Sequence, residues 1–158
     1  MKKILLVFLA IAVVTVGYWL ISPLFIERQV SESLSDIMPV PEGSPTSSVD
    51  ISEPQEISSG TFVSLVGHSA EGTARLLQIG DRYFVRFEDD FRVTNGPDLF
   101  VHFGKDDGYL AEARLGALKG NVGSQNYEVP AELNPEDYNE VWVWCRAFSV
   151  PFGKAVLQ

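Results

Sequence analysis

The sequence predicts an all-β domain, an antiparallel β-sandwich or partly closed barrel, preceded by one N-terminal transmembrane helix and a disordered tether. Three observations support this prediction. Residues 4–26 contain no charged side chain, and residues 27–59 are rich in Pro, Ser and Glu. From residue 60 onward, short runs of aromatic and β-branched residues alternate with Gly, Asp, Asn and Pro, which is typical of short strands joined by turns.

Residues 1–26 are predicted to be an uncleaved signal anchor. The 23 uncharged residues would span about 34 Å as a helix, enough to cross a bilayer core of about 30 Å. Lys2 and Lys3 precede them, and positive flanking residues tend to stay cytoplasmic. We therefore expect a single-pass cell-membrane protein whose C-terminal domain lies outside the cytoplasm. A cleaved signal peptide and a buried helix of a soluble protein are the alternatives; the only A-x-A motif, at 10–12, lies inside the apolar run.

The segment 27–59 is predicted to be an amphipathic, Pro-Ser-Glu-rich tether. Its first apolar residues, Val30, Leu34 and Ile37, recur at helical spacing after Ile26. This short amphipathic part could lie on the membrane surface or pack on the domain. The composition after it cannot bury enough apolar surface to offset its chain entropy. A flexible segment of this length would span about 30 Å on average, so the domain would be free to search near the membrane.

Net charge excludes some partners. Residues 1–26, 27–60 and 61–158 carry +2, −6 and −5, which gives −9 for the chain. Neither soluble part is net basic, so nucleic acid is not an expected partner. The 60–158 region has the size of one small domain with a single core. It contains no hydrolase, phosphate-loop or zinc-ligand motif, so we expect no metal site and no independent catalytic activity.

Seven strands are expected in the 60–158 region. Hairpin turns are predicted at 80–82 and 94–98, where Gly, Asp, Asn and Pro cluster. Residues 109–119 contain Ala, Glu, Arg and Leu, and predict a short helix or an irregular crossing before Gly120. The expected strands are 61–66, 73–79, 83–88, 99–103, 126–129, 141–148 and 154–157.

Cys145 is the only cysteine in the chain, so no intrachain disulfide can form. Strand alternation places it on one face with Val141 and Val143, and places Trp142 and Trp144 on the other face. Both faces carry apolar groups, so alternation leaves open which one faces the core. The thiol is either a small, inert core residue or a redox thiol, a cofactor ligand or part of an intermolecular disulfide.

The two histidines offer little ligand chemistry. His68 lies between two expected strands, as a loop histidine or as a ligand or proton carrier that meets Cys145 in space. His102 shares a strand face with Phe100 and is expected to be half-exposed. The sequence requires no cofactor. A haem or metal bound through Cys145 stays open, although no local ligand pairing supports it. The acidic clusters at 88–90 and 106–108 are expected to be solvated turns rather than calcium sites.

Two stretches exceed what a generic β-domain would supply: N-G-P-D-L-F-V at 95–101 and V-W-C-R-A-F-S-V-P-F-G at 143–153. They resemble the DM-thirteen domain, a Skeletor-type module also called the electron transfer DM-thirteen domain. The resemblance covers about residues 60–158, without the anchor or the tether. It implies an all-β, extracellular or membrane-attached domain, often found in animals beside haem-binding DOMON-type domains. It also implies a redox or electron-transfer role, which would fall on Cys145.

Two functions are therefore predicted as alternatives. In the first, the protein is a membrane-tethered extracytoplasmic redox module that uses Cys145, with His68 as a helper and an extracytoplasmic redox partner protein. In the second, it is a non-catalytic cell-surface binding or adhesion module in which Cys145 is a buried structural residue. Its candidate contacts are then Asn95, Gly96, Pro97, Asp98, Trp142 and Trp144.

Overall fold

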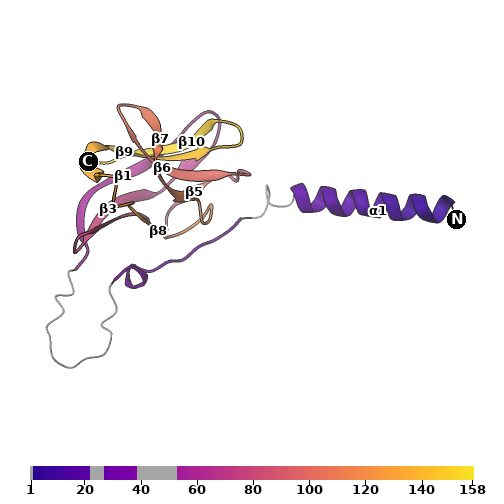
Figure 1. The fold of residues 1–158 in the computed structure, drawn as a ribbon, viewed down its shortest axis with the longest axis horizontal. Coiled ribbons are helices and arrows are strands. Elements are labelled where there is room, and N and C mark those ends of the chain that lie inside the picture. Colours follow the sequence, from indigo (N-terminus) through magenta and orange to yellow (C-terminus); the bar gives the residue numbers. More distant parts are fainter. Residues whose placement is uncertain (1, 22–26, 39–52) are drawn as a thin grey trace, which may run out of the picture.

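A computed structural model describes residues 2–21, 27–38 and 53–158 (Figure 1). The N-terminal segment forms the helix α1 (Lys2–Ile21), as the apolar run predicts. In the described part of the chain, no helix combines the length and the apolarity that crossing a membrane requires. The predicted membrane span is thus not confirmed. Most of the predicted Pro-rich part of the tether lies outside the described residues.

The rest of the described chain contains strands, the connections between them and two short 3-10 turns, η2 (Leu34–Asp36) and η3 (Pro135–Asp137). Eight strands form one antiparallel sheet in the order β7-β6-β9-β10-β1-β3-β4-β8, and β2 pairs with β5. The strands are β1 (Gln55–Ser64), β2 (Ala70–Glu71), β3 (Thr73–Ile79), β4 (Arg82–Phe87), β5 (Arg92–Val93), β6 (Leu99–Lys105), β7 (Gly108–Ala117), β8 (Gln125–Glu128), β9 (Glu140–Cys145) and β10 (Val150–Val156).

The large sheet curls into a nearly closed barrel, which confirms the all-β prediction in its barrel form. Its two edge strands come together: a Cβ at Gly116 of β7 would lie 3.6 Å from the ring of Tyr127 in β8. No hydrogen-bonded ladder joins these two strands in the described chain. The interior is filled by buried aromatic and aliphatic side chains from every strand of the large sheet and from β2 and β5, among them Phe87 and Phe103, and by Phe91, which precedes β5.

Two tight turns set the registers of neighbouring hairpins. Gly80, at φ 64°, closes the two-residue connection between Ile79 and Arg82, as predicted. Asp106 and Asp107 both have positive φ, 53° and 66°, and connect β6 to β7. Two consecutive positive φ values are what a type I′ hairpin turn requires. The predicted solvated turn at 106–108 is therefore a hairpin turn.

Several predicted boundaries differ from the structure. Residues 108–117 form the strand β7, so the prediction of a helix or irregular crossing there is wrong; pairing with β6 overrides the helix-favouring composition. Strand β1 begins at Gln55, inside the predicted tether, because it pairs with β3 from there onward. Strand β9 ends at Cys145, where the chain turns back to begin β10 at Val150.

Residues 27–38 lie along the β8 side of the barrel (Figure 1). They are extended except for one 3-10 turn, η2 (Leu34–Asp36), so the helical spacing of their apolar residues does not produce an amphipathic helix. The Ser33 side chain caps this turn, and the Asp36 carboxylate accepts from the Ser33 amide at 2.7 Å. Of the two predicted locations for this segment, the structure shows packing on the domain.

Candidate functional site

Cys145 is the last residue of β9 and faces the inside of the barrel. Strand alternation places it with Val141 and Val143, and all three side chains are 0% exposed. The backbone of Cys145 pairs with Leu99 on β6 and with Val150 on β10, so neighbouring strands enclose it on both sides. Alternation left open which face of β9 points into the core. The structure shows that it is the face with the two valines and Cys145. The thiol is free and buried.

The surroundings of Cys145 do not fit a haem or a metal ion. The sulfur lies in the hydrophobic cluster of the barrel, and Cys145 lines none of the described clefts. Within the described residues, no three His, Cys, Asp or Glu side chains are close enough together to hold a metal. A haem would need a cavity beside the sulfur, and a metal would need further ligands. We therefore assign no cofactor step to this residue.

His68 lies in the loop between β1 and β2, and its ring stacks on Phe152 at 3.6 Å between ring centroids, with the planes 7° apart. Phe152 is buried, at 3% exposed, and its ring lies under Gly96. Among the described residues, His68 makes no hydrogen bond to Cys145. Its described role is therefore an aromatic contact that covers one end of the core.

The outer face of β9 carries Trp142 and Trp144. Trp144 stacks on Tyr109 of β7, with ring centroids 4.1 Å apart and planes at 3°. Tyr109 in turn contacts the ring of His102 edge to face at 4.7 Å. Phe100 completes the group at 6.4 Å from His102. This outer aromatic cluster, Phe100, His102, Tyr109 and Trp144, is partly open to solvent, apart from His102.

His102 is buried, at 4% exposed, and not half-exposed as predicted. Burial lowers its pKa, because the charged form loses hydration. A contact of its Nδ1 with the carbonyl oxygen of Leu110, at 3.2 Å, acts in the opposite direction. The positive charge of Arg114 lowers the pKa further. The neutral ring is therefore favoured within the aromatic cluster.

Trp142 is buried on the outer face of the sheet, where it contacts the charged side chains of Glu140 and Lys154. Its indole Nε1 donates to Glu140 Oε2 at 2.9 Å, and Lys154 Nζ donates to Glu140 Oε1 at 2.8 Å. Lys154 also pairs with Asp107. Burial would lower the pKa of Lys154, but the hydrogen bonds to Asp107 and Glu140 outweigh it and raise that pKa. Glu140 is only 3% exposed, and the positive charge of Lys154 thus balances the negative charge of its carboxylate.

The predicted turn residues Asn95, Gly96, Pro97 and Asp98 line a cleft of about 540 Å³. Asp98 is bonded to Arg146, whose Nε lies 2.8 Å from Asp98 Oδ2. That ion pair joins the cleft to the outer aromatic cluster, since Arg146 also lies over the Phe100 ring at 4.7 Å. The structure therefore brings the predicted turn and the predicted tryptophan face together through Asp98 and Arg146. The other lining residues are Glu27, Arg28, Leu99, Ala117, Leu118, Lys119, Gly120 and Asn121.

A family model described as Electron transfer DM13 matches residues 61–157. The chain belongs to the electron transfer DM13 family. The resemblance seen in the sequence is confirmed, and at a coarse level the family identifies the DM13 domain as a redox-related module. No curated protein and no solved structure is significantly similar to the chain.

The DM13 match begins at residue 61, yet the structure adds an earlier segment to the domain. We call residues 27–36 the strap. Its backbone amides donate from Val30 to the Val122 carbonyl and from Glu32 to the Ser124 carbonyl, each at 2.9 Å. A Cβ at Gly120 would collide with the carbonyl of Arg28, and one at Gly123 with that of Val30. Glycine at these two positions lets the strap approach the backbone of the barrel.

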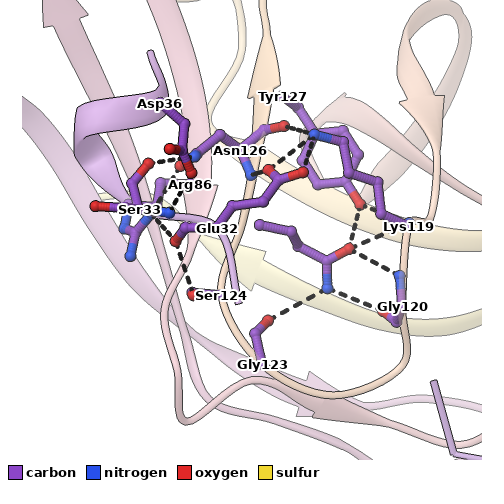
Figure 2. A network of polar contacts seen from close by, with 11 residues as sticks. Glu32, Ser33, Asp36, Arg86, Lys119, Gly120, Gly123, Ser124, Asn126 and Tyr127 are labelled. Atoms are coloured by element: carbon purple, nitrogen blue, oxygen red, sulfur yellow. Dashed lines mark hydrogen bonds and ion pairs between the residues drawn. The ribbon is translucent and has the colours of Figure 1, made fainter. Parts of the chain in front are cut away.

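The Glu32 carboxylate completes the open edge of the DM13 barrel at β8 (Figure 2). Glu32 Oε2 accepts from the amide of Asn126 at 2.7 Å, and both carboxylate oxygens lie 2.8 Å from Lys119 Nζ. Lys119 Nζ also donates to the Asn126 carbonyl at 2.7 Å. One ion pair thus supplies the acceptor and the donor that a neighbouring strand would otherwise give to Asn126.

Further polar side chains hold the network of Glu32, Lys119 and Asn126 in place. Arg86, 8% exposed, donates to the Glu32 carbonyl at 3.2 Å and to the side-chain oxygen of Asn126 at 2.8 Å. The Tyr127 hydroxyl donates to Gln125 Oε1 at 2.6 Å, and burial raises the pKa of that hydroxyl. Sequence reasoning missed Glu32 and Tyr109. For the strap, the apolar spacing of Val30 and Leu34 left packing on the domain as one alternative, and the glycines at 120 and 123 were a second signal.

Proposed function

We propose that this DM13 domain is a membrane-tethered, extracytoplasmic redox module in which Cys145 is the redox residue. The family assignment supports the redox role. The uncharged run of residues 4–26 behind Lys2 and Lys3 supports the membrane anchor and its orientation. The described apolar side chains of α1 add support, because Phe8, Val13 and Val14 are 66%, 65% and 70% exposed and would otherwise face water.

The burial of Cys145 determines which redox chemistry fits. A thiol that is 0% exposed is inaccessible to soluble thiols and disulfides. One-electron exchange through the protein does not require such contact: the Cys145 thiol would give one electron to an oxidising partner protein and release its proton to solvent, which leaves a thiyl radical, and the reverse step would restore the thiol. Trp144 precedes Cys145 on β9 and projects to the opposite face, where it stacks on Tyr109 at 4.1 Å. This stack is the observation that supports the proposal, because it offers a redox partner protein a partly exposed aromatic contact at Trp144, the residue next to Cys145 on the same strand.

The test combines a thiol titration with a redox assay on the full-length protein in mild detergent. We expect the native thiol to be unreactive toward an aromatic disulfide reagent and to react fully after denaturation. Cys145→Ala should abolish electron exchange with a chemical one-electron acceptor, and Trp144→Leu should slow it. The matched control is Phe148→Leu, an exposed substitution outside the stack. Exchange that survives in Cys145→Ala would eliminate the thiol as the redox residue.

Localisation needs a separate experiment. In spheroplasts or intact cells, an added protease should digest the β-domain, while an epitope tag fused ahead of Lys2 stays protected. Carbonate extraction should leave the protein in the membrane fraction. A protected β-domain or a protein released by carbonate would contradict the proposed topology without bearing on the redox role of Cys145.

A second candidate function is a cell-surface binding module in which Cys145 is structural. Two observations favour it: a cleft of about 540 Å³ is lined by Gly96, Pro97 and Asp98, and the Cys145 thiol is fully buried in the core. Here Asp98→Asn should weaken ligand binding found in a screen of the full-length protein, whereas Cys145→Ala should leave binding unchanged. Redox activity that is lost in Cys145→Ala would favour the first function over this one.

A further inference from the structure

The strap leaves little free chain between α1 and the barrel. Helix α1 ends at Ile21, and the described contacts of the strap begin with Glu27, whose Oε1 lies 2.9 Å from Arg92 Nη1. The next amide, of Arg28, donates to Asn121 Oδ1 at 2.6 Å. Six Cα-to-Cα steps separate Ile21 from Glu27, and they can span at most about 22 Å. If α1 is the membrane anchor, the barrel end that receives Glu27 therefore lies next to the bilayer.

The same end of the barrel carries three loops. Glu27 and Arg28 line one cleft with the 95–98 turn. The Arg146 amide donates to the Asp98 carbonyl at 3.0 Å, which places the β9–β10 loop beside that turn. The β1–β2 loop follows, since the Leu65 amide donates to the Phe152 carbonyl at 3.1 Å. We call this end, with loops 65–69, 94–98 and 146–149, the strap end.

The strap end exposes the two most accessible large apolar side chains described in the β-domain. Phe148 is 69% exposed in the β9–β10 loop, and Val66 is 66% exposed in the β1–β2 loop. These two loops leave neighbouring strands of the sheet, because β10 lies between β1 and β9. Aromatic and aliphatic side chains at loop tips gain free energy when they enter the apolar side of a membrane interface.

We propose that the strap end of the barrel rests on the outer surface of the bilayer, with Val66 and Phe148 inserted at the interface. This inference rests on the proposed membrane anchor and adds an orientation to it. The strap transmits that orientation, because its hydrogen bonds hold the barrel in one position relative to residue 27. The 95–98 cleft then opens beside the membrane, so a ligand or partner would reach it along the bilayer surface.

The test is site-specific photocrosslinking of the full-length protein in phosphatidylcholine nanodiscs. Benzoylphenylalanine replaces Phe148, Val66, Glu132 or Val13, one at a time, and mass spectrometry detects phospholipid adducts. Each of these side chains is exposed, so the replacements do not disturb the core. Glu132 is the matched control, because its loop follows Val129, whose amide donates to the Tyr83 carbonyl at 2.8 Å at the opposite end of the barrel. Val13 reports on α1.

We expect adducts at Val13, Val66 and Phe148 and none at Glu132. Adducts at Val13 without adducts at Val66 and Phe148 would overturn the proposed orientation and leave the anchor standing. Equal adducts at Glu132 and Phe148 would also overturn it, since the barrel would then have no preferred end. No adduct at Val13 would overturn the anchor itself and this inference with it.

Discussion

Glu32→Ala should destabilise the whole β-domain, although Glu32 lies far outside the segment 61–157 that the family model matches. The substitution removes the acceptor of the Asn126 amide at 2.7 Å and the partner of Lys119 Nζ at 2.8 Å. A hydrogen bond to a charged group contributes about 1.5–3 kcal/mol. The ion pair adds about 0–1 kcal/mol, because the Lys119 side chain is 41% exposed and solvent screens it. We expect a total loss of about 2–4 kcal/mol.

The assay is urea unfolding of the full-length protein in mild detergent, followed by tryptophan fluorescence. With a denaturant slope of about 2 kcal/mol per molar, the midpoint should fall by about 1–2 M. Glu32→Gln keeps an oxygen acceptor without the charge and should lose less. Glu27→Ala is the matched control, since its carboxylate pairs with Arg92 on an exposed surface and its loss should cost at most about 1 kcal/mol. If Glu32→Ala and Glu27→Ala unfold at the same midpoint, the strap is not part of the folded domain.

Three further predictions concern the barrel itself. Cys145→Ser should lower the free energy of unfolding by about 1–3 kcal/mol in the same urea assay, because a hydroxyl replaces a thiol that is 0% exposed in an apolar core; an unchanged midpoint would mean that the site is not sealed. Gly104→Ala should cost about 1–3 kcal/mol and change the near-ultraviolet circular dichroism, since a Cβ there would collide with the Trp142 indole; unchanged signals would contradict that contact. Burial lowers the pKa of His102 in the folded protein, so its contribution to stability should be complete above about pH 6.5 and decline as the pH falls below that value; a His102→Gln variant with the same pH dependence of unfolding between pH 7 and 5 would refute this.

The strands that sequence could predict are those whose pattern is local. Residues 73–79 and 83–88 alternate or run apolar between turn residues, and both appear close to their predicted bounds. Strand β7 was misassigned because its Ala, Glu, Arg and Leu residues favour a helix in isolation. Only pairing with β6 makes it a strand, with Ala113 turned into the core and Arg114 turned outward over Phe100. That pairing is a tertiary effect, and local propensity does not encode it.

The candidate site divides in the same way, into features set by local strand geometry and features set by tertiary contacts. Alternation correctly separated the face with Cys145 from the face with Trp144, since that depends on strand geometry alone. It could not say which face was inside, because Trp142 is itself buried where Gly104 leaves room for its ring. Tyr109, the stacking partner of Trp144, lies on β7, whose composition predicted a helix or an irregular crossing instead of a strand. Packing of the strap on the domain was one of two predicted alternatives, but the ion pair and hydrogen bond of Glu32 were not predicted, because their partners, Lys119 and Asn126, lie about ninety residues away in the sequence.

The position of Cys145 constrains any redox role that the family assignment implies. A lone thiol enclosed by Leu99, Val143 and Val150 has no second cysteine and no aqueous access in the folded barrel. Disulfide exchange would therefore require the strands to separate at the strap end of the barrel, where β9 ends at Cys145, and that local opening would slow the exchange. One-electron exchange instead requires an oxidising partner close enough to the sulfur and release of the thiol proton to solvent, and Trp144 stacked on Tyr109 is the partly exposed aromatic group next to Cys145 along β9. A slow thiol titration and a fast electron exchange, measured on the same sample, would be the combined signature of this arrangement. Two slow rates would instead make Cys145 a core residue that serves only packing.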